Sequence, residues 1–235
     1  MMKTCSARGV GFVVAMLTMA GSAPALAGSE SGDVMVRVLA TGVLPDTSAG
    51  GISVNGAANA VPAGSYEISD EVIPALTLSY FVTKNVALEL FCCFAKHDVE
   101  GEGALAGVDI ADTWIFPPAV TLQYHFDNFG AFKPYAGVGF QYINFFNTDS
   151  KDPGGSMSID DAVGFTLQAG IDISLGGGWY LNADVKKTWL ETEWTINDAA
   201  GDRLHGSFDL DPIIVSAGVG YRFDLFGSRT EVPLK

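Results

Sequence analysis

From Val163 to Leu175 the chain alternates strictly between apolar residues and small or polar residues. The odd positions carry Val, Phe, Leu, Ala, Ile, Ile and Leu, and the even positions carry Gly, Thr, Gln, Gly, Asp and Ser. Successive side chains of a β-strand point to opposite faces, so this segment predicts a strand with one wholly apolar face. A tilted strand crosses a membrane with about 9–11 residues, whereas strands of globular sheets usually have about 5–6. The length and pattern therefore favour a membrane barrel over a soluble sandwich.

Segments of this kind recur along the chain, and the connections between them alternate in length. The eight predicted strands are residues 33–44, 72–82, 86–99, 113–127, 132–147, 160–175, 179–196 and 208–223. Long connections are expected at 45–71, 100–112, 148–159 and 197–207, and short ones at 83–85, 128–131 and 176–178. Bacterial outer-membrane barrels have long external loops and short periplasmic turns. The sequence therefore predicts an all-β fold, a closed, up-and-down, antiparallel transmembrane barrel of eight strands.

The N-terminal region has the features of a cleavable secretion signal. Lys3 and Arg8 form a basic segment, residues 9–20 are apolar, and Ala25 and Ala27 flank Leu26 at a small-x-small cleavage site. We expect residues 1–27 to be a signal peptide, 28–223 to form the barrel and 224–235 to be a C-terminal extension. An uncleaved anchor helix is the alternative for the first of these segments.

Charge and cysteine content narrow the function classes. The 13 Lys and Arg residues fall to 11 when Lys3 and Arg8 leave with the signal, and against 27 Asp and Glu the net charge becomes −16. Such a balance argues against nucleic acid as a partner. Cys92 and Cys93 are adjacent in a predicted strand, so they face opposite sides and cannot bridge each other. We interpret them as small apolar strand residues, with a redox or metal role as the alternative.

An ordered set of short motifs resembles the OmpW family. The motifs are Leu88-Glu-Leu90, Lys96-His97-Asp98, residues 116–126 (FPPAVTLQYHF), 133–139 (KPYAGVG), 144–146 (NFF), 181–185 (LNADV), Asp211-Pro212 and 220–223 (GYRF). The resemblance implies an eight-stranded outer-membrane barrel associated with uptake of small hydrophobic compounds. Two features depart from the family pattern. Cys92-Cys93-Phe94-Ala95 replaces a stretch that many members fill with small residues and proline, and the chain continues beyond Phe223, so either Phe223 or Phe226 is the terminal aromatic read by the barrel-assembly machinery.

The residues expected to face the lumen divide by height into two sets. The set near the periplasmic end is charged and consists of Arg37, Glu89, His125, Asp172, Asp184, Lys186 and Arg222. Buried charges must pair, so this set predicts a polar plug that closes the lower lumen, with barrel stabilisation as its simplest role. The higher set is apolar and consists of Phe91, Cys93, Ile143, Phe145, Leu190 and Ile214. It predicts a pocket for a hydrophobic small molecule, and the alternative is that these side chains only pack against each other.

Signals for catalysis are weak. His97, His125 and His205 lie on separate segments, and neither a Ser-His-Asp spacing, a metal-ligand spacing nor a phosphate-binding glycine loop is present. We expect that the protein is not an enzyme and has no cofactor or metal site. The alternative is a membrane protease or acyltransferase, whose site would include Asp98 beside His97.

The sequence thus predicts a passive channel or receptor for small hydrophobic molecules. The expected partners are outer-membrane lipid and lipopolysaccharide, small hydrophobic solutes and the barrel-assembly machinery. Two alternatives remain at this point: a structural or surface-interaction protein with a filled lumen and no transport, and a soluble periplasmic ligand-binding barrel.

Overall fold

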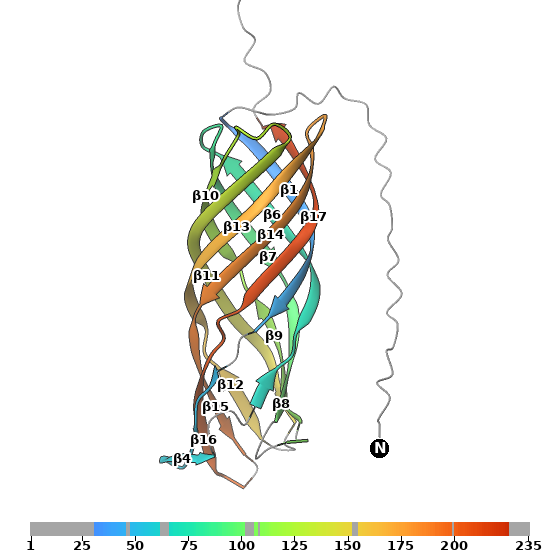
Figure 1. Cartoon of the computed structure of the whole chain (residues 1–235). Coiled ribbons are helices and arrows are strands. Elements are labelled where there is room, and N and C mark those ends of the chain that lie inside the picture. The colour runs from blue at the N-terminus through green and yellow to red at the C-terminus, as the bar shows by residue number, and fades with distance from the viewer. Residues whose placement is uncertain are drawn as a thin grey trace, which may run out of the picture.

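The alternating segments form strands that close into one barrel (Figure 1). The computed structural model describes residues 31–45, 48–61, 66–101, 106–107, 109–151, 155–198 and 200–225. Residues 1–27, expected to be a signal peptide, and most of the expected C-terminal extension, including Phe226, lie outside these ranges. The barrel strands are β1 (Asp33–Leu44), β6 (Glu71–Phe81), β7 (Val86–Cys93), β10 (Ala119–His125), β11 (Phe132–Ser150), β13 (Ala162–Gly176), β14 (Trp179–Trp189) and β17 (Ile213–Asp224).

Closure follows from the pairing of the first and last strands. β1 pairs with β17 from Asp33↔Asp224 to Leu44↔Ile213, and on its other side it pairs with β6. The ring continues through β7, β10, β11, β13 and β14 back to β17, and every neighbouring pair is antiparallel. The predicted eight-stranded, up-and-down barrel is confirmed.

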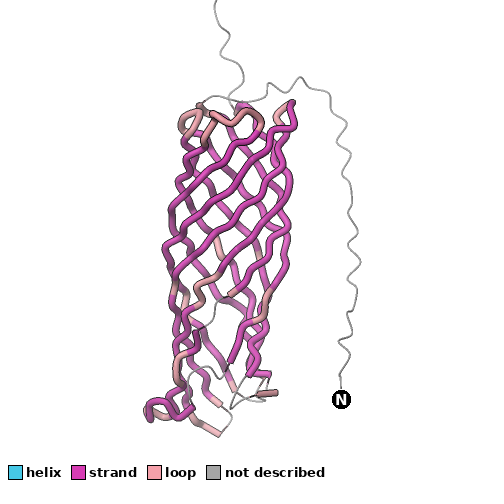
Figure 2. Tube along the Cα trace, viewed as in Figure 1, coloured by secondary structure: helices cyan, strands magenta, loops and turns pink. Residues whose placement is uncertain are grey.

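The two ends of the barrel differ sharply (Figures 1 and 2). We call one the turn end: it holds Asp33, Asp224 and the short connections at 82–85, 126–131 and 177–178. The other, the loop end, carries an extension of further strands. These strands are β2 (Ser48–Ala49), β3 (Ile52–Val54), β4 (Ala57–Val61), β5 (Tyr66–Ile68), β8 (Ala95–Gly101), β9 (Asp109–Phe116), β12 (Ser156–Ile159), β15 (Glu191–Asn197) and β16 (Arg203–Asp209).

The extension corrects part of the sequence-based prediction. Residues 45–71, expected to be a loop, contain β2 to β5, and most of 197–207 belongs to the β15–β16 hairpin. The Asn55-Gly56 dipeptide was a sequence signal for the β3–β4 hairpin. In the structure both residues have positive φ, at 49° and 84°, between these paired strands. Asn-Gly is the preferred sequence for such a hairpin turn.

Four segments predicted as single strands are each divided where the barrel meets the extension. The breaks fall at Phe94, at Pro117-Pro118, at Leu190 and at residues 210–212. The prolines cannot donate to a ladder, which interrupts their strands. At the other breaks the chain changes pairing partners: β7 pairs with β10, whereas its continuation β8 pairs with β9 and β5.

The outer surface of the barrel is apolar, with aromatic residues near both ends. Val38, Leu78, Leu122, Leu167 and Val215 are among the large aliphatic side chains exposed on it. Aromatic rings are exposed toward the turn end at Tyr80, Tyr124, Phe126 and Trp179, where the half-buried Tyr221 packs against Trp179, and toward the loop end at Phe94, Trp114, Phe140, Phe165 and Trp189. Aromatic girdles flanking an apolar band are typical of outer-membrane barrels. None of the described residues forms a helix long and apolar enough to cross a membrane.

Candidate functional site

The lumen toward the turn end contains a network of charged side chains, which we call the plug, centred on Arg37. Its guanidinium binds Asp172 through two hydrogen bonds, Nε to Oδ1 at 3.0 Å and Nη2 to Oδ2 at 2.6 Å. Its Nη1 donates to Glu89 Oε2 at 2.9 Å and to Ser79 Oγ at 2.7 Å. Arg37 lies on β1, Glu89 on β7 and Asp172 on β13, so one side chain spans the lumen and connects three strands.

Lys186 forms the second cationic centre of the plug. Its Nζ lies 2.5 Å from Asp184 Oδ1 and 3.4 Å from Glu89 Oε1, and it is 4.9 Å from the centroid of the Phe91 ring. Lys186, Glu89 and Arg37 are each only 1% exposed. Burial of this depth makes pairing obligatory, since an unpaired charge there would be very costly.

Neutral polar side chains outside the predicted charged set complete the network. Gln168 donates through Nε2 to Glu89 at 2.9 Å and to Asp184 at 2.7 Å, and the Tyr135 hydroxyl donates to Asp184 at 2.8 Å. Gly170 makes room for that tyrosine, because a Cβ at this position would lie 2.4 Å from the Tyr135 ring. A glycine inside a strand is the sequence signal for such a close approach.

His125 and Arg222 lie at the turn-end edge of the plug. His125 Nδ1 is 3.8 Å from Asp172 Oδ2, and its Nε2 is 3.0 Å from Gln123 Oε1. Arg222 was expected to pair with the acids of the plug, but its Nε donates to Asp33 Oδ2 at 3.0 Å, and its guanidinium carbon lies 3.5 Å from the Phe81 ring centroid. The register of β1 against β17 places Asp33 and Arg222 near the same end of the barrel. The sequence alone does not reveal that these two residues are neighbours.

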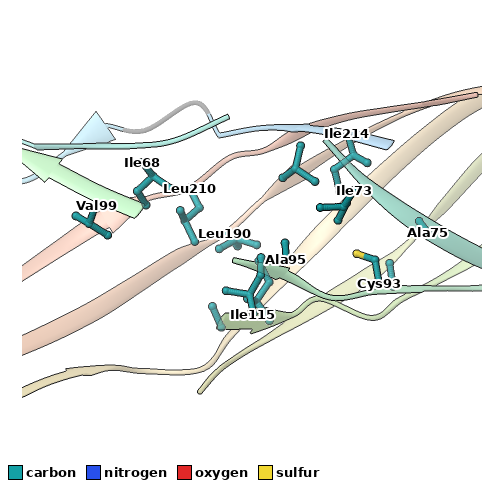
Figure 3. Close-up of a cluster of buried hydrophobic side chains, with 14 of the residues drawn as sticks. Ile68, Ile73, Ala75, Cys93, Ala95, Val99, Ile115, Leu190, Leu210 and Ile214 are labelled. Atoms are coloured by element: carbon teal, nitrogen blue, oxygen red, sulfur yellow. The ribbon is translucent and has the colours of Figure 1, made fainter. Parts of the chain in front are cut away.

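Above the plug, the six residues predicted for the apolar pocket lie in or against one buried cluster, of which Figure 3 labels Cys93, Leu190 and Ile214. Phe91, Cys93, Ile143, Leu190 and Ile214 are buried in it, and Phe145 packs against it. The cluster encloses a cavity of about 40 Å³. Four of the predicted residues line that cavity (Cys93, Ile143, Phe145 and Ile214), while Phe91 and Leu190 pack behind the lining.

The polar groups that line the cavity are His97, Thr113 and Gln141, together with the thiol of Cys93. The Thr113 hydroxyl hydrogen-bonds with that of Thr148 at 2.8 Å. Gln141 donates to the Pro117 carbonyl at 3.3 Å and accepts from Thr188 at 2.7 Å. His97 Nδ1 lies 2.9 Å from the Ser69 carbonyl oxygen.

The structure does not bring the side chain of Asp98 to His97. Its neighbour Asp98 is exposed on the opposite face of β8, so the two side chains point away from each other. Across the part of the chain that the structure describes, no group of three or more His, Cys, Asp or Glu residues could hold a metal ion.

On the outer surface of the extension, one carboxylate joins two lysines. Asp112 Oδ1 lies 2.5 Å from Lys151 Nζ, and Asp112 also pairs with Lys96. These hydrogen bonds lower the pKa of Asp112 to about 2, so it is ionised at neutral pH. The contact connects β8, β9 and the residue that directly follows β11.

Comparison with known proteins gives this architecture a family. The model of the OmpW family matches residues 30–223. The chain belongs to the OmpW family. An uncharacterized outer-membrane protein of Sinorhizobium fredii, y4mB, is 40% identical over 215 residues, which cover 91% of this chain and 90% of that protein. The dibenzothiophene metabolism operon protein PahQ of Pseudomonas aeruginosa is 28% identical over 193 residues, which cover 80% of this chain and 87% of PahQ.

Solved structures of OmpW-type barrels share the fold. The crystal structure of OprG from Pseudomonas aeruginosa has a TM-score of 0.76 at 28% identity, covering 83% of this chain and 98% of OprG. The solid-state NMR structure of AlkL in DMPC lipid bilayers has a TM-score of 0.70 at 28% identity, covering 86% of this chain and 95% of AlkL. The protein is therefore an outer-membrane barrel. By the usual topology of such barrels, the turn end faces the periplasm and the loop end faces outward.

Proposed function

We propose that this OmpW-family barrel takes small hydrophobic molecules from the outer surface into the membrane. The observation that carries the proposal is the vertical division of the lumen: an apolar cavity at the loop end lies above a paired, buried plug. An apolar cavity favours an apolar solute, and the plug opposes passage of ions and water. The relationship to PahQ, whose name refers to dibenzothiophene metabolism, supports an aromatic or hydrophobic solute.

A solute stopped by the plug would leave sideways, and the barrel wall offers a place for this. The β6–β7 ladder ends at Ala75↔Cys93, and β5 rejoins β8 at Ile68↔Val99. Between these points, residues 71–74 of β6 pair with β1 on one side. On the other side they have no ladder pairing with residues 94–98, and the structure describes both segments. Pro74 has no N–H to donate there. We propose this interval as the exit toward lipid.

A second candidate function rests on the size of the cavity. About 40 Å³ holds a few water molecules at most, so a solute enters only if lining side chains move. A barrel that stays closed would instead be a structural or surface-interaction protein with a filled lumen. We propose no catalytic role for either case.

Uptake in a deletion strain separates the two functions. Cells lacking the gene are complemented with wild type or with Leu190→Asp, and uptake of naphthalene is measured. A carboxylate in the narrow apolar cluster is costly and repels an apolar solute, so we expect the variant to lose the barrel-dependent uptake. Leu175→Asp, at an exposed position near the turn end of β13, serves as the matched control.

Assembly is checked for each variant by heat-modifiable migration on gels. Loss of naphthalene uptake in assembled Leu190→Asp, with permeability to hydrophilic solutes still low, supports the conduit. Wild-type uptake by assembled Leu190→Asp, or uptake that does not depend on the barrel at all, would leave the filled-lumen protein as the better account.

A further inference from the structure

His97 differs from the other polar side chains that line the apolar cavity. It points inward from β8, is 4% exposed and lies among Ile68, Val99 and Ile115. The hydrogen-bonding atoms of Thr113 and Gln141 are engaged by Thr148, Pro117 and Thr188, as described above. The Cys93 thiol is only a weak donor. His97 therefore differs from them in having a strong polar atom that no other described side chain or carbonyl contacts.

The contact with Ser69 shows that the available atom of His97 is Nε2. A carbonyl oxygen only accepts, so Nδ1 must carry the proton that it donates across 2.9 Å. In the neutral ring the proton on Nδ1 leaves Nε2 as an acceptor. Within the described ranges, Nε2 has no hydrogen-bond partner, although the side chain is buried and lines the cavity.

We propose that the cavity selects hydrophobic molecules that carry one hydroxyl group, an alcohol or a phenol, and that the hydroxyl donates its hydrogen bond to His97 Nε2. This inference rests on the proposed uptake function and deepens it. A hydrocarbon satisfies the apolar walls but leaves Nε2 unpaired. A carboxylate at neutral pH has no proton to donate, and it brings a charge into apolar surroundings.

His97 also has a structural task, which must be separated from this one. Its Nδ1 holds β8 to the link between β5 and β6, where Ser69 N donates to the Asp98 carbonyl at 3.2 Å. That task needs Nδ1 alone. Asparagine keeps a donor near the Nδ1 position but does not reach the Nε2 position, whereas phenylalanine fills the space and has neither group.

The test compares 1-naphthol, naphthalene and 1-naphthoate in the deletion strain complemented with wild type, His97→Phe or His97→Asn. The measured quantity is the ratio of barrel-dependent 1-naphthol uptake to barrel-dependent naphthalene uptake. We expect both variants to lower this ratio roughly three- to ten-fold, the effect of one neutral hydrogen bond, while naphthalene uptake persists. Barrel-dependent 1-naphthoate uptake should be the lowest of the three in wild type.

His205→Phe is the matched control, because it makes the same replacement at an exposed histidine on β16 outside the cavity. It should keep the wild-type ratio. An unchanged ratio in both His97 variants, with naphthalene uptake still dependent on the barrel, would overturn the role of His97 while leaving the proposed function in place. Absence of barrel-dependent uptake of both naphthalene and 1-naphthol would overturn both.

Discussion

At the scale of single residues, Arg37 has the largest structural role in the lumen. Its three guanidinium nitrogens contact two carboxylates and two hydroxyls, and those partners lie on β13, β7 and β6. Replacing it leaves Asp172 and Glu89 buried with less compensating charge. Removal of one member of a buried ion pair is far more damaging than the net contribution of the pair would suggest.

We expect Arg37→Met to lower the free energy of unfolding by about 3–5 kcal/mol, because Asp172 loses the guanidinium that binds it and Glu89 keeps only Lys186 as a cationic partner. The measurement is the temperature at which the folded band disappears in heat-modifiability gels. Arg203→Met, at an exposed position of β16, is the control and should leave that temperature unchanged. Equal midpoints for Arg37→Met and wild type would show that the plug does not stabilise the barrel.

His97, which lines the cavity, makes the stability of the folded protein depend on pH. Burial lowers the pKa of His97 below its usual 6.5, although the nearby carboxylates of Glu71, Asp98 and Asp70 and the Ser69 carbonyl act in the opposite direction. The folded protein therefore binds the proton less strongly than the unfolded chain does. The contribution to stability is complete above pH 6.5 and is lost as the pH falls through that value toward the folded pKa.

Protonation would also change Nε2 from an acceptor to a donor. We expect the preference for 1-naphthol over naphthalene to change below pH 6.5, because the hydroxyl must then accept from Nε2 instead of donating to it, with a midpoint equal to the titration midpoint of the His97 ring measured by NMR. A His97 midpoint above 6.5, or a preference that stays constant through the ring's titration, would contradict this assignment.

At the scale of the element, β13 has one face toward the membrane and the other toward the lumen. Leu167 is exposed on the outer face, at 42%, while its neighbour Gln168 is 4% exposed and hydrogen-bonded inside the plug. Both faces are set by the alternation alone, because the pairing of β13 with β11 and β14 has no bulge near this point.

A charge on the outer face of β13 should cost more the deeper it lies. We expect Leu167→Arg, near the middle of the strand, to destabilise the barrel by about 2–4 kcal/mol, and Val163→Arg, on the same face near the loop end, by about 0–1 kcal/mol. Folding titrations of the two variants in lipid vesicles measure this difference. Similar losses at the two positions would mean that the apolar band does not extend across this strand as described.

At the scale of the whole molecule, the lumen is divided into two parts by height. The plug occupies the half toward the turn end, and the apolar cluster occupies the half toward the loop end and continues into the extension through Ile68, Val99 and Leu210 (Figure 3). The extension therefore continues the interior of the barrel, and its strands supply much of the cavity lining.

This division predicts a low ionic conductance. In planar bilayers the wild-type protein should conduct KCl close to the baseline level, because paired side chains fill the lumen around Arg37. Arg37→Ala removes the side chain that spans β1, β7 and β13, so conductance should rise as water enters. Arg203→Ala provides the comparison outside the lumen. A large wild-type conductance, or no change in Arg37→Ala, would show that the plug does not close the barrel.

The sequence by itself determined the parts that depend on local alternation. A side chain's face is fixed by a period of two, so the eight strands, the outward apolar face and the division of inward residues into charged and apolar sets could all be read from one chain. The six residues of the predicted pocket fell into one cluster because each faced inward at a similar height. The Asn55-Gly56 turn was also visible in the sequence, yet the prediction treated its surroundings as loop.

Only the tertiary structure decided which inward residues meet. Arg222 pairs with Asp33, and Gln168, Tyr135 and Ser79 complete the plug, because register and closure bring together residues far apart in the chain. The same holds for His97, whose exposed neighbour and family motif gave no sign of a buried acceptor. Alternation specifies the face of a residue, whereas the partner across a lumen depends on how far each strand is shifted against the next, and that shift is a property of the closed barrel.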